Sequence, residues 1–330
     1  MATIVHELDL PEIDNMDLTR HEALVALEAA RDQHWLARTP LGYIVMHHAD
    51  VTAVLGDRRF HSALSLLPQM SGVEDAALSD RQQRSILAME GDEHQRLRRL
   101  VAPAFTPRSA DRLRPVMRRV IGGLVEPLLP SGRCELVADV CEPYPIPIIC
   151  ELLGAPAEDW KLFSAWATDI FRIFNNDMAN DLERIKAAMS ELDAYVRAMI
   201  DERRSQPADD LLSDLIAAEE AGDRLSPDEL VMMCEAVLMA GTDTTRNQLA
   251  CSVALLAQRP DQWRRLAQDP ELAKSAVEET MRHLGAVGGT ARFASEEIEY
   301  RDVIFPVGTL VAVSLATANM DGTIWEDPHR

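Results

Sequence analysis

The sequence has few aromatic residues, no long apolar run and a shortage of positive charge. Phe, Trp and Tyr make up 5% of the 330 residues, whereas 47% are hydrophobic, a fraction that excludes wholesale disorder. Lys and Arg total 33 against 54 Asp and Glu, and the resulting net charge of −21 would repel phosphate backbones. Nucleic acid is therefore excluded as a general partner. No run reaches the roughly 18 apolar residues that a membrane-spanning helix needs.

Cysteines are also scarce and unsuited to a structural framework. There are five, an odd number, and no two of them form a Cys-x-x-Cys pair. A disulfide framework or a zinc site is therefore not expected. We expect buried free thiols in a reducing compartment instead. The acidic N-terminus does not have the pattern of a signal peptide, so we expect a cytoplasmic protein. The cysteines are Cys134, Cys141, Cys150, Cys234 and Cys251.

Helical periodicity dominates what is present. Helices are expected at 49–55, from Pro107 onward, at 158–174 and at 181–204. Short β-like runs occur at 42–46 and between 298 and 313, around a Pro-Val-Gly turn. With no repeat and no long linker, the sequence predicts a single, mainly α domain over 1–330 with a small β-sheet at its edge.

The strongest helix start lies at Ser226, where a capping residue is followed by Pro227 and by Glu229 at the capping-box position. No stop signal follows until Pro260, so one long helix is predicted over about 227–258. Residues 230–240 are apolar on nearly every face except for Glu235, and this predicts a helix that passes through the core.

A run of small and polar residues, Ala-Gly-Thr-Asp-Thr-Thr at 240–245, interrupts this apolar helix. Glycine inside a helix costs about 1 kcal/mol relative to alanine, and Thr244 can bond the carbonyl of Ala240 and loosen the ladder. Two interpretations are open. The run is a kink with solvated polar residues, or Ala240 and Gly241 admit a large flat ligand while Asp243 and Thr244 form a proton relay.

Two further pairs have helical spacing. Glu279 and Arg282 stand three apart and can form an ion pair, as many surface pairs do. His94 and Arg98 stand four apart, where they can bind an anionic group together or form part of a solvated basic face.

Taken in order, these motifs resemble the cytochrome P450 family in its soluble bacterial form, over essentially the whole chain. The similarity rests on six motifs with matching order and spacing. They are the strand and helix at 43–60, the helix and turn at 92–108, residues 150–156, residues 210–230 with the 240–245 run, the Glu279–Arg282 pair, and residues 305–328.

The resemblance implies a heme-dependent monooxygenase and assigns roles to residues. His94, Arg98 and Arg292 would bind heme propionates, and Ala240 and Gly241 would lie against the heme. In the family the residues that correspond to Asp243 and Thr244 deliver protons during oxygen activation, and Glu279 and Arg282 are structural. Substrate would be enclosed by residues 62–89, 171–189, Met239 and 286–291.

The sequence departs from the family pattern at the iron ligand. The family holds its iron with a cysteine thiolate in a glycine-rich loop, and none of the five cysteines lies in such a loop. We expect the axial cysteine beyond Arg330, so that no metal ligand lies in this chain, which is then inactive alone. Smaller departures are Met281, where leucine is usual, and Met320, where arginine is frequent.

Three hypotheses follow. The first is a monooxygenase that hydroxylates a lipophilic small molecule with electrons from a ferredoxin-type donor. The second is a heme-free accessory scaffold similar to helpers of glycosyltransferases, and the third is a helical ligand-binding module without redox chemistry. For the first, the arginine-rich stretch 91–119 offers a docking face for an acidic donor, although a solvated face is an equal interpretation. That face includes Arg96, Arg99, Arg112 and Arg118.

Overall fold

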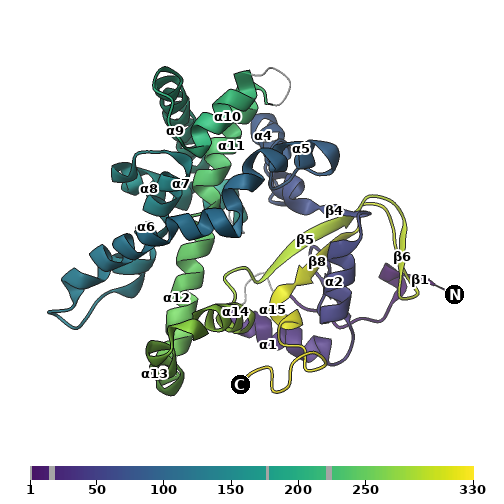
Figure 1. Ribbon diagram of the computed structural model, residues 1–330. Helices are drawn as coiled ribbons and strands as arrows, with labels where there is room; N and C mark the ends of the chain where they lie inside the picture. Colours follow the sequence, from purple (N-terminus) through teal and green to yellow (C-terminus); the bar gives the residue numbers. More distant parts are fainter. Residues whose placement is uncertain (1, 15–18, 176–177, 221–224) are drawn as a thin grey trace. The chain divides into compact units, whose positions relative to one another are not determined.

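The computed structural model describes residues 2–14, 19–175, 178–220 and 225–330. Helices predominate, and the named strands form two small sheets (Figure 1). The mainly α fold with a small sheet is thereby confirmed. The chain forms two compact units, Met1–Leu64 with Cys251–Arg330, and Ser65–Ala250. The single domain over 1–330 stays a prediction.

The first unit contains a five-stranded sheet in which β3 and β8 pair in parallel, while the other neighbouring strands are antiparallel. The sequence predicts β3 and β8, and it misses the other three strands. Those three are short or carry arginine or histidine, so their period-2 pattern is weak. The strands, in spatial order, are β2 (Leu36–Thr39), β3 (Gly42–Val45), β8 (Leu310–Ser314), β5 (Gly289–Ala294) and β4 (Phe60–Ser62).

A three-stranded sheet completes the strands of this unit, in the order β1 (Thr3–Ile4), β7 (Val303–Phe305) and β6 (Ile298–Tyr300). The hairpin of β6 and β7 matches the predicted late β-rich region. Its turn places Arg301 and Asp302 at positive φ, 50° and 58°. An apolar core shared by both sheets includes Leu36, Val45 and Phe305, each fully buried.

The helices of the first unit include α2, which matches the helix predicted at 49–55. Its helices are α1 (Arg20–Arg31), α2 (His48–Gly56), α13 (Pro260–Gln268), α14 (Ala273–His283) and α15 (Leu315–Ala318). In α1, Thr19 and Glu22 form a capping box, which satisfies two backbone N–H groups at the helix start.

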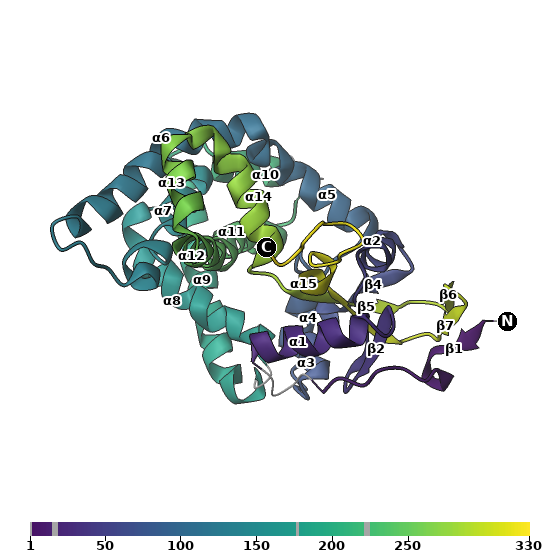
Figure 2. The ribbon, with the colours of Figure 1, turned by 90° about the horizontal axis from the view of Figure 1, so that it is seen from below.

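In its described residues, the second unit contains helices joined by loops, and no named strand (Figure 2). Thr106 caps α6 as predicted, by accepting a hydrogen bond from the Ser109 N–H at 3.2 Å. Gly154 ends α7 at a φ of 91°, where glycine is favoured. Its helices are α3 (Leu67–Met70), α4 (Ala76–Gln83), α5 (Gly91–Val101), α6 (Pro107–Val125), α7 (Pro145–Leu153), α8 (Trp160–Ile170), α9 (Met178–Ser205), α10 (Leu211–Glu220) and α11 (Pro227–Ala240).

Two of the predicted helices differ at their ends. The helix predicted at 158–174 is α8 with a 3-10 turn on each side, at Ala157–Asp159 and Phe171–Phe174. The helix predicted from residue 181 begins at Met178. The loop predicted at 175–181 is wrong at residues 178–181, which belong to α9, and its residues 176–177 lie outside the described residues.

Helix α11 passes through the core of the second unit, as its apolar sequence predicts. Leu230, Cys234 and Leu238 are almost fully buried, in one cluster with side chains of α7, α8, α9 and α10. The predicted capping box is present, with the Ser226 N–H donating to Glu229 Oε2 at 2.8 Å and the Glu229 N–H donating to Ser226 Oγ at 3.3 Å.

The predicted single helix over 227–258 is wrong in one respect. It is two helices, α11 and α12 (Asp243–Ala257), separated by a turn at Gly241 and Thr242. The overall span is as expected, but the threonine hydroxyl groups of the polar run donate to backbone carbonyl groups that would accept backbone N–H groups in a continuous helix.

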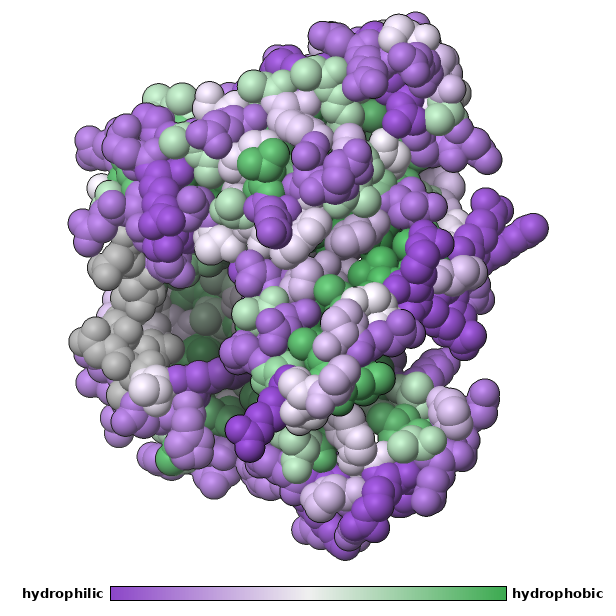
Figure 3. Space-filling view, turned by 90° about the vertical axis from the view of Figure 1, so that its left-hand side faces the viewer, coloured by the Kyte–Doolittle hydropathy of each residue, from purple (hydrophilic) through white to green (hydrophobic). Residues whose placement is uncertain are grey.

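The face of the molecule in Figure 3 is largely hydrophilic, with scattered apolar patches. This accords with the charged composition of the chain. Among the described residues, none of the helices is both long enough and apolar enough to span a membrane.

Candidate active site

The turn between α11 and α12 is held open by threonine hydroxyl groups. Thr242 is buried, and its Oγ1 donates to the Met239 carbonyl at 2.8 Å. Thr244 Oγ1 donates to the Ala240 carbonyl at 3.0 Å, which is the bond that the sequence predicts. Ala240 and Thr244 are both exposed, so an accessible hydroxyl group and a small side chain lie one turn apart.

Asp243 is anchored by two partners that the sequence analysis missed. Its Oδ1 accepts hydrogen bonds from Arg246 at 2.7 and 3.1 Å, and its Oδ2 accepts one from Asn247 Nδ2 at 3.0 Å. Arg246 also donates to Thr168 Oγ1 of α8 at 3.3 Å. The spacings of three and four residues are the available signal for these partners, because they place the side chains on one helix face. The carboxylate is thus held in place beside Thr244.

Gly241 is required by packing within the second unit. A Cβ atom at this position would lie 2.1 Å from Cγ1 and 2.3 Å from Cδ1 of Ile149, on α7. The small residue therefore lets α7 and α11 approach closely. This is a different reason from the flat ligand considered at the sequence level, whereas Ala240 remains open to such a ligand because it is exposed.

His94 and Arg98 lie one turn apart on α5, with His94 half-buried and Arg98 exposed. Neither side chain makes a hydrogen bond or an ion pair with any described residue, whereas Arg96 between them is bonded to Glu93 and Glu229. Two cationic or hydrogen-bonding groups without protein partners on one helix suit a carboxylate ligand. This is the feature of the structure that fits a heme propionate.

Arg292 lies on β5 of the first unit, half-buried. Its Nη1 donates to the Ala291 carbonyl at 3.0 Å and to Thr290 Oγ1 at 3.4 Å. The contacts hold the guanidinium group close to its own strand, and the sequence predicts a role for it in propionate binding.

Glu279 and Arg282 form the predicted ion pair on α14. Arg282 donates to Glu279 at 2.7 and 2.8 Å, and these hydrogen bonds, against a smaller effect of burial, lower the pKa of Glu279. Arg282 also donates to the carbonyls of Asn319 and Pro328, both at 2.9 Å, and it lies over the Trp325 ring at 5.6 Å. The pair therefore attaches residues 319–328 to α14, a structural function.

The segments predicted to enclose substrate are partly brought together. Residues 65–89 and 171–189 share an apolar cluster in the second unit, and Met239 lies in the large core of that unit. Residues 286–291, with 62–64, belong to the first unit. The shared cluster consists of Val73, Leu78, Ile173, Met178 and Ile185.

The buried cysteines are poor candidates for a thiolate ligand. Burial raises the pKa of Cys150 and of Cys234 to about 12, so both thiols stay protonated near neutral pH. Burial also raises the pKa of Cys141. Cys134 is exposed and Cys251 is half-buried. In the described residues, no group of three His, Cys, Asp or Glu side chains could hold a metal ion.

Comparison with known proteins decides the family. The cytochrome P450 family model matches residues 157–330. Nocardicin C N-oxygenase of Nocardia uniformis subsp. tsuyamanensis is 36% identical over 301 residues, which cover 88% of this chain and 73% of that protein. The chain belongs to the cytochrome P450 family. It is accordingly an oxidoreductase of the monooxygenase class, and the family implies a heme cofactor.

Other known proteins are similar over most of their length. Luteothin monooxygenase of Streptomyces thioluteus is 32% identical, with 100% of this chain and 82% of that protein covered. The monooxygenase PikC of Streptomyces venezuelae is 37% identical, with 89% and 70% covered. The crystal structure of CalO2 aligns with a TM-score of 0.89 at 28% identity, covering 97% of this chain and 81% of CalO2.

Proposed function

We propose that this cytochrome P450 hydroxylates a lipophilic small molecule with dioxygen and electrons from a ferredoxin-type donor. The observation that carries the proposal is the turn at Ala240–Thr244, where an exposed hydroxyl group lies beside an anchored carboxylate. Arg246 and Asn247 hold the Asp243 carboxylate next to Thr244, whose oxygen can accept a hydrogen bond from a water molecule and so position a donor toward a reacting oxygen, as general acid catalysis requires.

Heme, when bound, supplies the iron at which dioxygen is activated. His94 and Arg98 on α5 would hold its propionates, and Arg292 on β5 is the third residue that the sequence assigns to this role. Support comes from the lack of a protein partner for His94 and Arg98 among the described residues, since a pair of this kind is free to bind a dicarboxylate. Ala240 would lie against the heme face, because its methyl group is the smallest side chain that a helix favours.

The buried cysteines of this chain are poorly suited to act as the axial thiolate ligand of the heme iron. Cys150 and Cys234, with pKa values of about 12, would have to lose a proton in an apolar core. The expectation of an axial cysteine beyond Arg330 stays a prediction. All five cysteines are unpaired, in keeping with the reducing, cytoplasmic setting that the sequence predicts.

A lipophilic substrate is supported by the apolar cluster that joins the enclosing segments of the second unit. Val73 and Leu78 pack there with Ile173, and all three are buried against one another. An apolar ligand enclosed by segments of this composition would be favoured because the removal of apolar surface from water is favourable.

The electron donor docks on exposed arginines of α5 and α6. Arg99, Arg112 and Arg118 are exposed and have no side-chain partner among the described residues. Arg96 contributes less than the sequence predicts, because Glu93 and Glu229 neutralise its charge. An acidic ferredoxin would be steered toward such a face.

The proposal is tested by heme titration of the purified chain, followed by absorption spectroscopy. The double variant His94→Ala/Arg98→Ala should bind heme at least tenfold more weakly, because a hydrogen bond to a charged group contributes about 1.5–3 kcal/mol. Arg99→Ala, a change on the same helix that removes a similar charge, should alter the affinity by less than about twofold.

Because this chain is expected to lack the axial ligand, the titration includes free imidazole as a substitute ligand. Absence of saturable heme binding by the wild-type chain under that condition would contradict the proposal and favour the heme-free scaffold. Equal affinities of the wild type and the double variant would remove the propionate assignment. A reduced carbon-monoxide spectrum of the thiolate type would mean that one of the five cysteines binds iron, contrary to the expectation for this chain.

A further inference from the structure

Helix α4 is attached to the second unit mainly through charged side chains. Of the eight residues of Ala76–Gln83, only Leu78 is buried. At the start of the helix, Asp75 caps the backbone and its Oδ2 forms an ion pair with Nζ of Lys186, on α9, at 2.8 Å. Burial of a single apolar side chain stabilises the position of α4 only weakly. The ion pairs of the helix therefore contribute much of what holds it in place.

At the other end of α4, Arg81 reaches a carboxylate in the core. Arg81 Nη2 donates to Glu235 Oε2 at 2.5 Å, and the Glu235 side chain is only 7% exposed. Glu235 Oε1 is buried and has no hydrogen-bond partner in the described part of the chain. Burial of a carboxylate with one unbonded oxygen costs free energy. Removal of its counter-ion would raise that cost.

The charges around Glu235 come from two helices besides its own. Arg81 faces it from α4, while Asp193 and Arg197 face it from α9. Asp193 Oδ2 lies 2.8 Å from Arg197 Nε, and Asp193 Oδ1 lies 3.7 Å from Arg81 Nη1. Arg197 is thus bonded to Asp193, so Arg81 is the cation bonded to Glu235 among the described residues.

We propose that Arg81 is the counter-ion that lets α4 close over the buried carboxylate of Glu235, so that α4 opens and closes as this ion pair breaks and forms. An open α4 would expose Glu235 to water, which solvates an ionised carboxylate better than the core does. Arg81 offsets that preference in the closed position. The Arg81–Glu235 ion pair, which we call the clasp, therefore sets whether α4 is open or closed and is not simply a source of stability.

The clasp gives α4 a role in substrate entry, and this part rests on the proposed function. Helix α4 lies within the segment 62–89 that is expected to enclose substrate. Glu235 lies on α11, which ends at Ala240 beside the proposed proton relay. The same ion pair thereby links the enclosing segment to the helix that carries the relay.

The proton linkage of the clasp has a defined sign. Burial raises the pKa of Glu235 above its ordinary value, although Arg81 opposes the effect. The closed position then binds the proton more tightly than an open, hydrated one. Lowering the pH favours the closed position, and raising it through the pKa of Glu235 makes closure dependent on Arg81.

The experiment is hydrogen exchange of the full 330-residue chain, without heme, resolved to α4 and α9. In Arg81→Met, exchange of the α4 amides at about pH 8 should rise at least tenfold, because the carboxylate loses its counter-ion. Addition of Glu235→Gln should bring the exchange back toward the wild-type rate, since no buried charge remains. Corrected for intrinsic rates, the effect of Arg81→Met should shrink toward about pH 5.

The matched control is Asp80→Asn on the same helix, which breaks the exposed pair with Arg84 and should change α4 exchange less than twofold. If the double variant is as open as Arg81→Met, then Arg81 acts through packing and the clasp is wrong. A change below twofold in Arg81→Met is equally decisive against it. If Arg81→Met unfolds the chain, the amides of α9 should exchange faster as well. In that case, recovery of slow α4 exchange on addition of Glu235→Gln distinguishes loss of the counter-ion from loss of packing. None of these outcomes depends on heme, so the proposed function stands or falls separately.

Discussion

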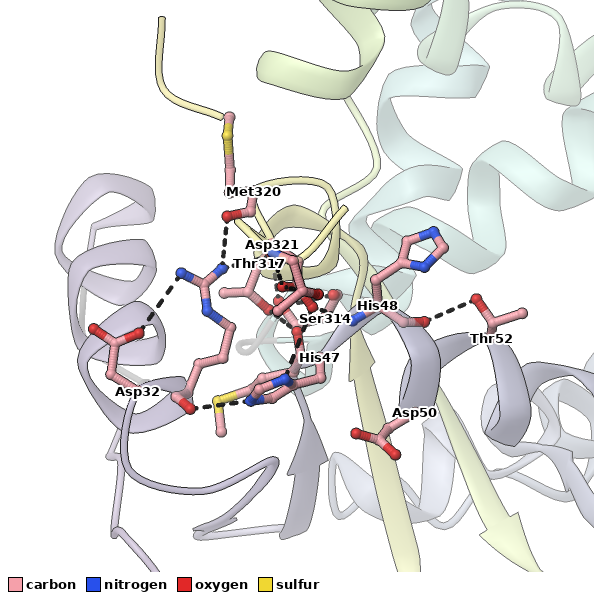
Figure 4. A network of polar contacts seen from close by, with 12 residues as sticks. Asp32, His47, His48, Asp50, Thr52, Ser314, Thr317, Met320 and Asp321 are labelled. Carbon is pink, nitrogen blue, oxygen red and sulfur yellow. Dashed lines mark hydrogen bonds and ion pairs between the residues drawn. The ribbon is translucent and has the colours of Figure 1, made fainter. Parts of the chain in front are cut away.

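At the scale of single residues, Asp321 shows how one carboxylate organises several backbone segments of the first unit (Figure 4). Its Oδ2 accepts the His48 N–H at 3.0 Å, and its Oδ1 accepts the Thr323 N–H at 2.9 Å and the Thr323 hydroxyl at 2.7 Å. Burial alone would raise its pKa, but these hydrogen bonds, with the charge of nearby His47, hold the pKa below its ordinary value.

This lowered pKa predicts acid-sensitive stability. A group with a depressed pKa in the folded state stabilises the fold above its unfolded pKa, and the contribution is lost as pH falls through the folded pKa. Asp321→Asn should therefore lower the free energy of unfolding by about 1–3 kcal/mol near neutral pH. The difference from the wild type should shrink as the pH approaches about 3. Thermal unfolding followed by near-UV circular dichroism across this range measures it.

Asp32→Asn is the control, because Asp32 is 77% exposed and lies 3.9 Å from Arg31 at the edge of the same network. It should leave the stability almost unchanged at any pH. A pH-independent loss in Asp321→Asn would mean that its shape, rather than its charge, matters.

At the scale of elements, the contact of α7 with α11 is set by Gly241. Ile149 occupies the space that a Cβ atom would take, at 2.1 Å from its Cγ1. The two helices could not lie so close with a larger residue unless Ile149 moved. The interruption of the long helix thus coincides with a packing constraint as well as with the proposed relay.

Gly241→Ala should lower the free energy of unfolding by about 1–3 kcal/mol, because the added methyl group overpacks this contact. In the double variant Gly241→Ala/Ile149→Ala, the methyl group has room, and the two effects should be less than additive by about 0.5–3 kcal/mol. Denaturant unfolding of the four chains measures this coupling. Additive effects would mean that Gly241 is required by its backbone or by a ligand, and not by Ile149.

At the scale of the whole molecule, the distribution of charge matters more than its sum. The chain carries a net charge of −21, yet Arg99, Arg112 and Arg118 are exposed without side-chain partners among the described residues. An acidic electron donor would meet repulsion over most of an acidic surface and attraction at these residues.

Binding of a plant-type [2Fe–2S] ferredoxin should therefore weaken at least tenfold between about 20 and 300 mM NaCl, as screening requires. The double variant Arg112→Gln/Arg118→Gln should lose most of that salt dependence. Titration calorimetry at both salt concentrations measures it. Arg264→Gln on α13 is the control, because Arg264 is 69% exposed and paired with Asp261. Salt-independent binding by the wild type would contradict the docking face.

Sequence alone was enough for local features whose physics acts over a few residues. The capping box at Ser226, the apolar run of α11, the bond from Thr244 to Ala240 and the pair of Glu279 with Arg282 all depend on helical spacing. The strands β3 and β8 were predicted because each has a clear run of β-forming residues. The order of these motifs also indicated the family, which the comparisons confirm.

Only the tertiary structure decided which distant groups meet, because packing is set by the whole fold and not by spacing. The contact of Gly241 with Ile149, the burial of Glu235 against Arg81 and the neutralisation of Arg96 by Glu229 join residues far apart in the chain. The same holds for the strands β2, β4 and β5, which form because their partners supply the hydrogen bonds. Burial then sets the pKa values of Cys150 and Cys234, since desolvation depends on every neighbour that excludes water.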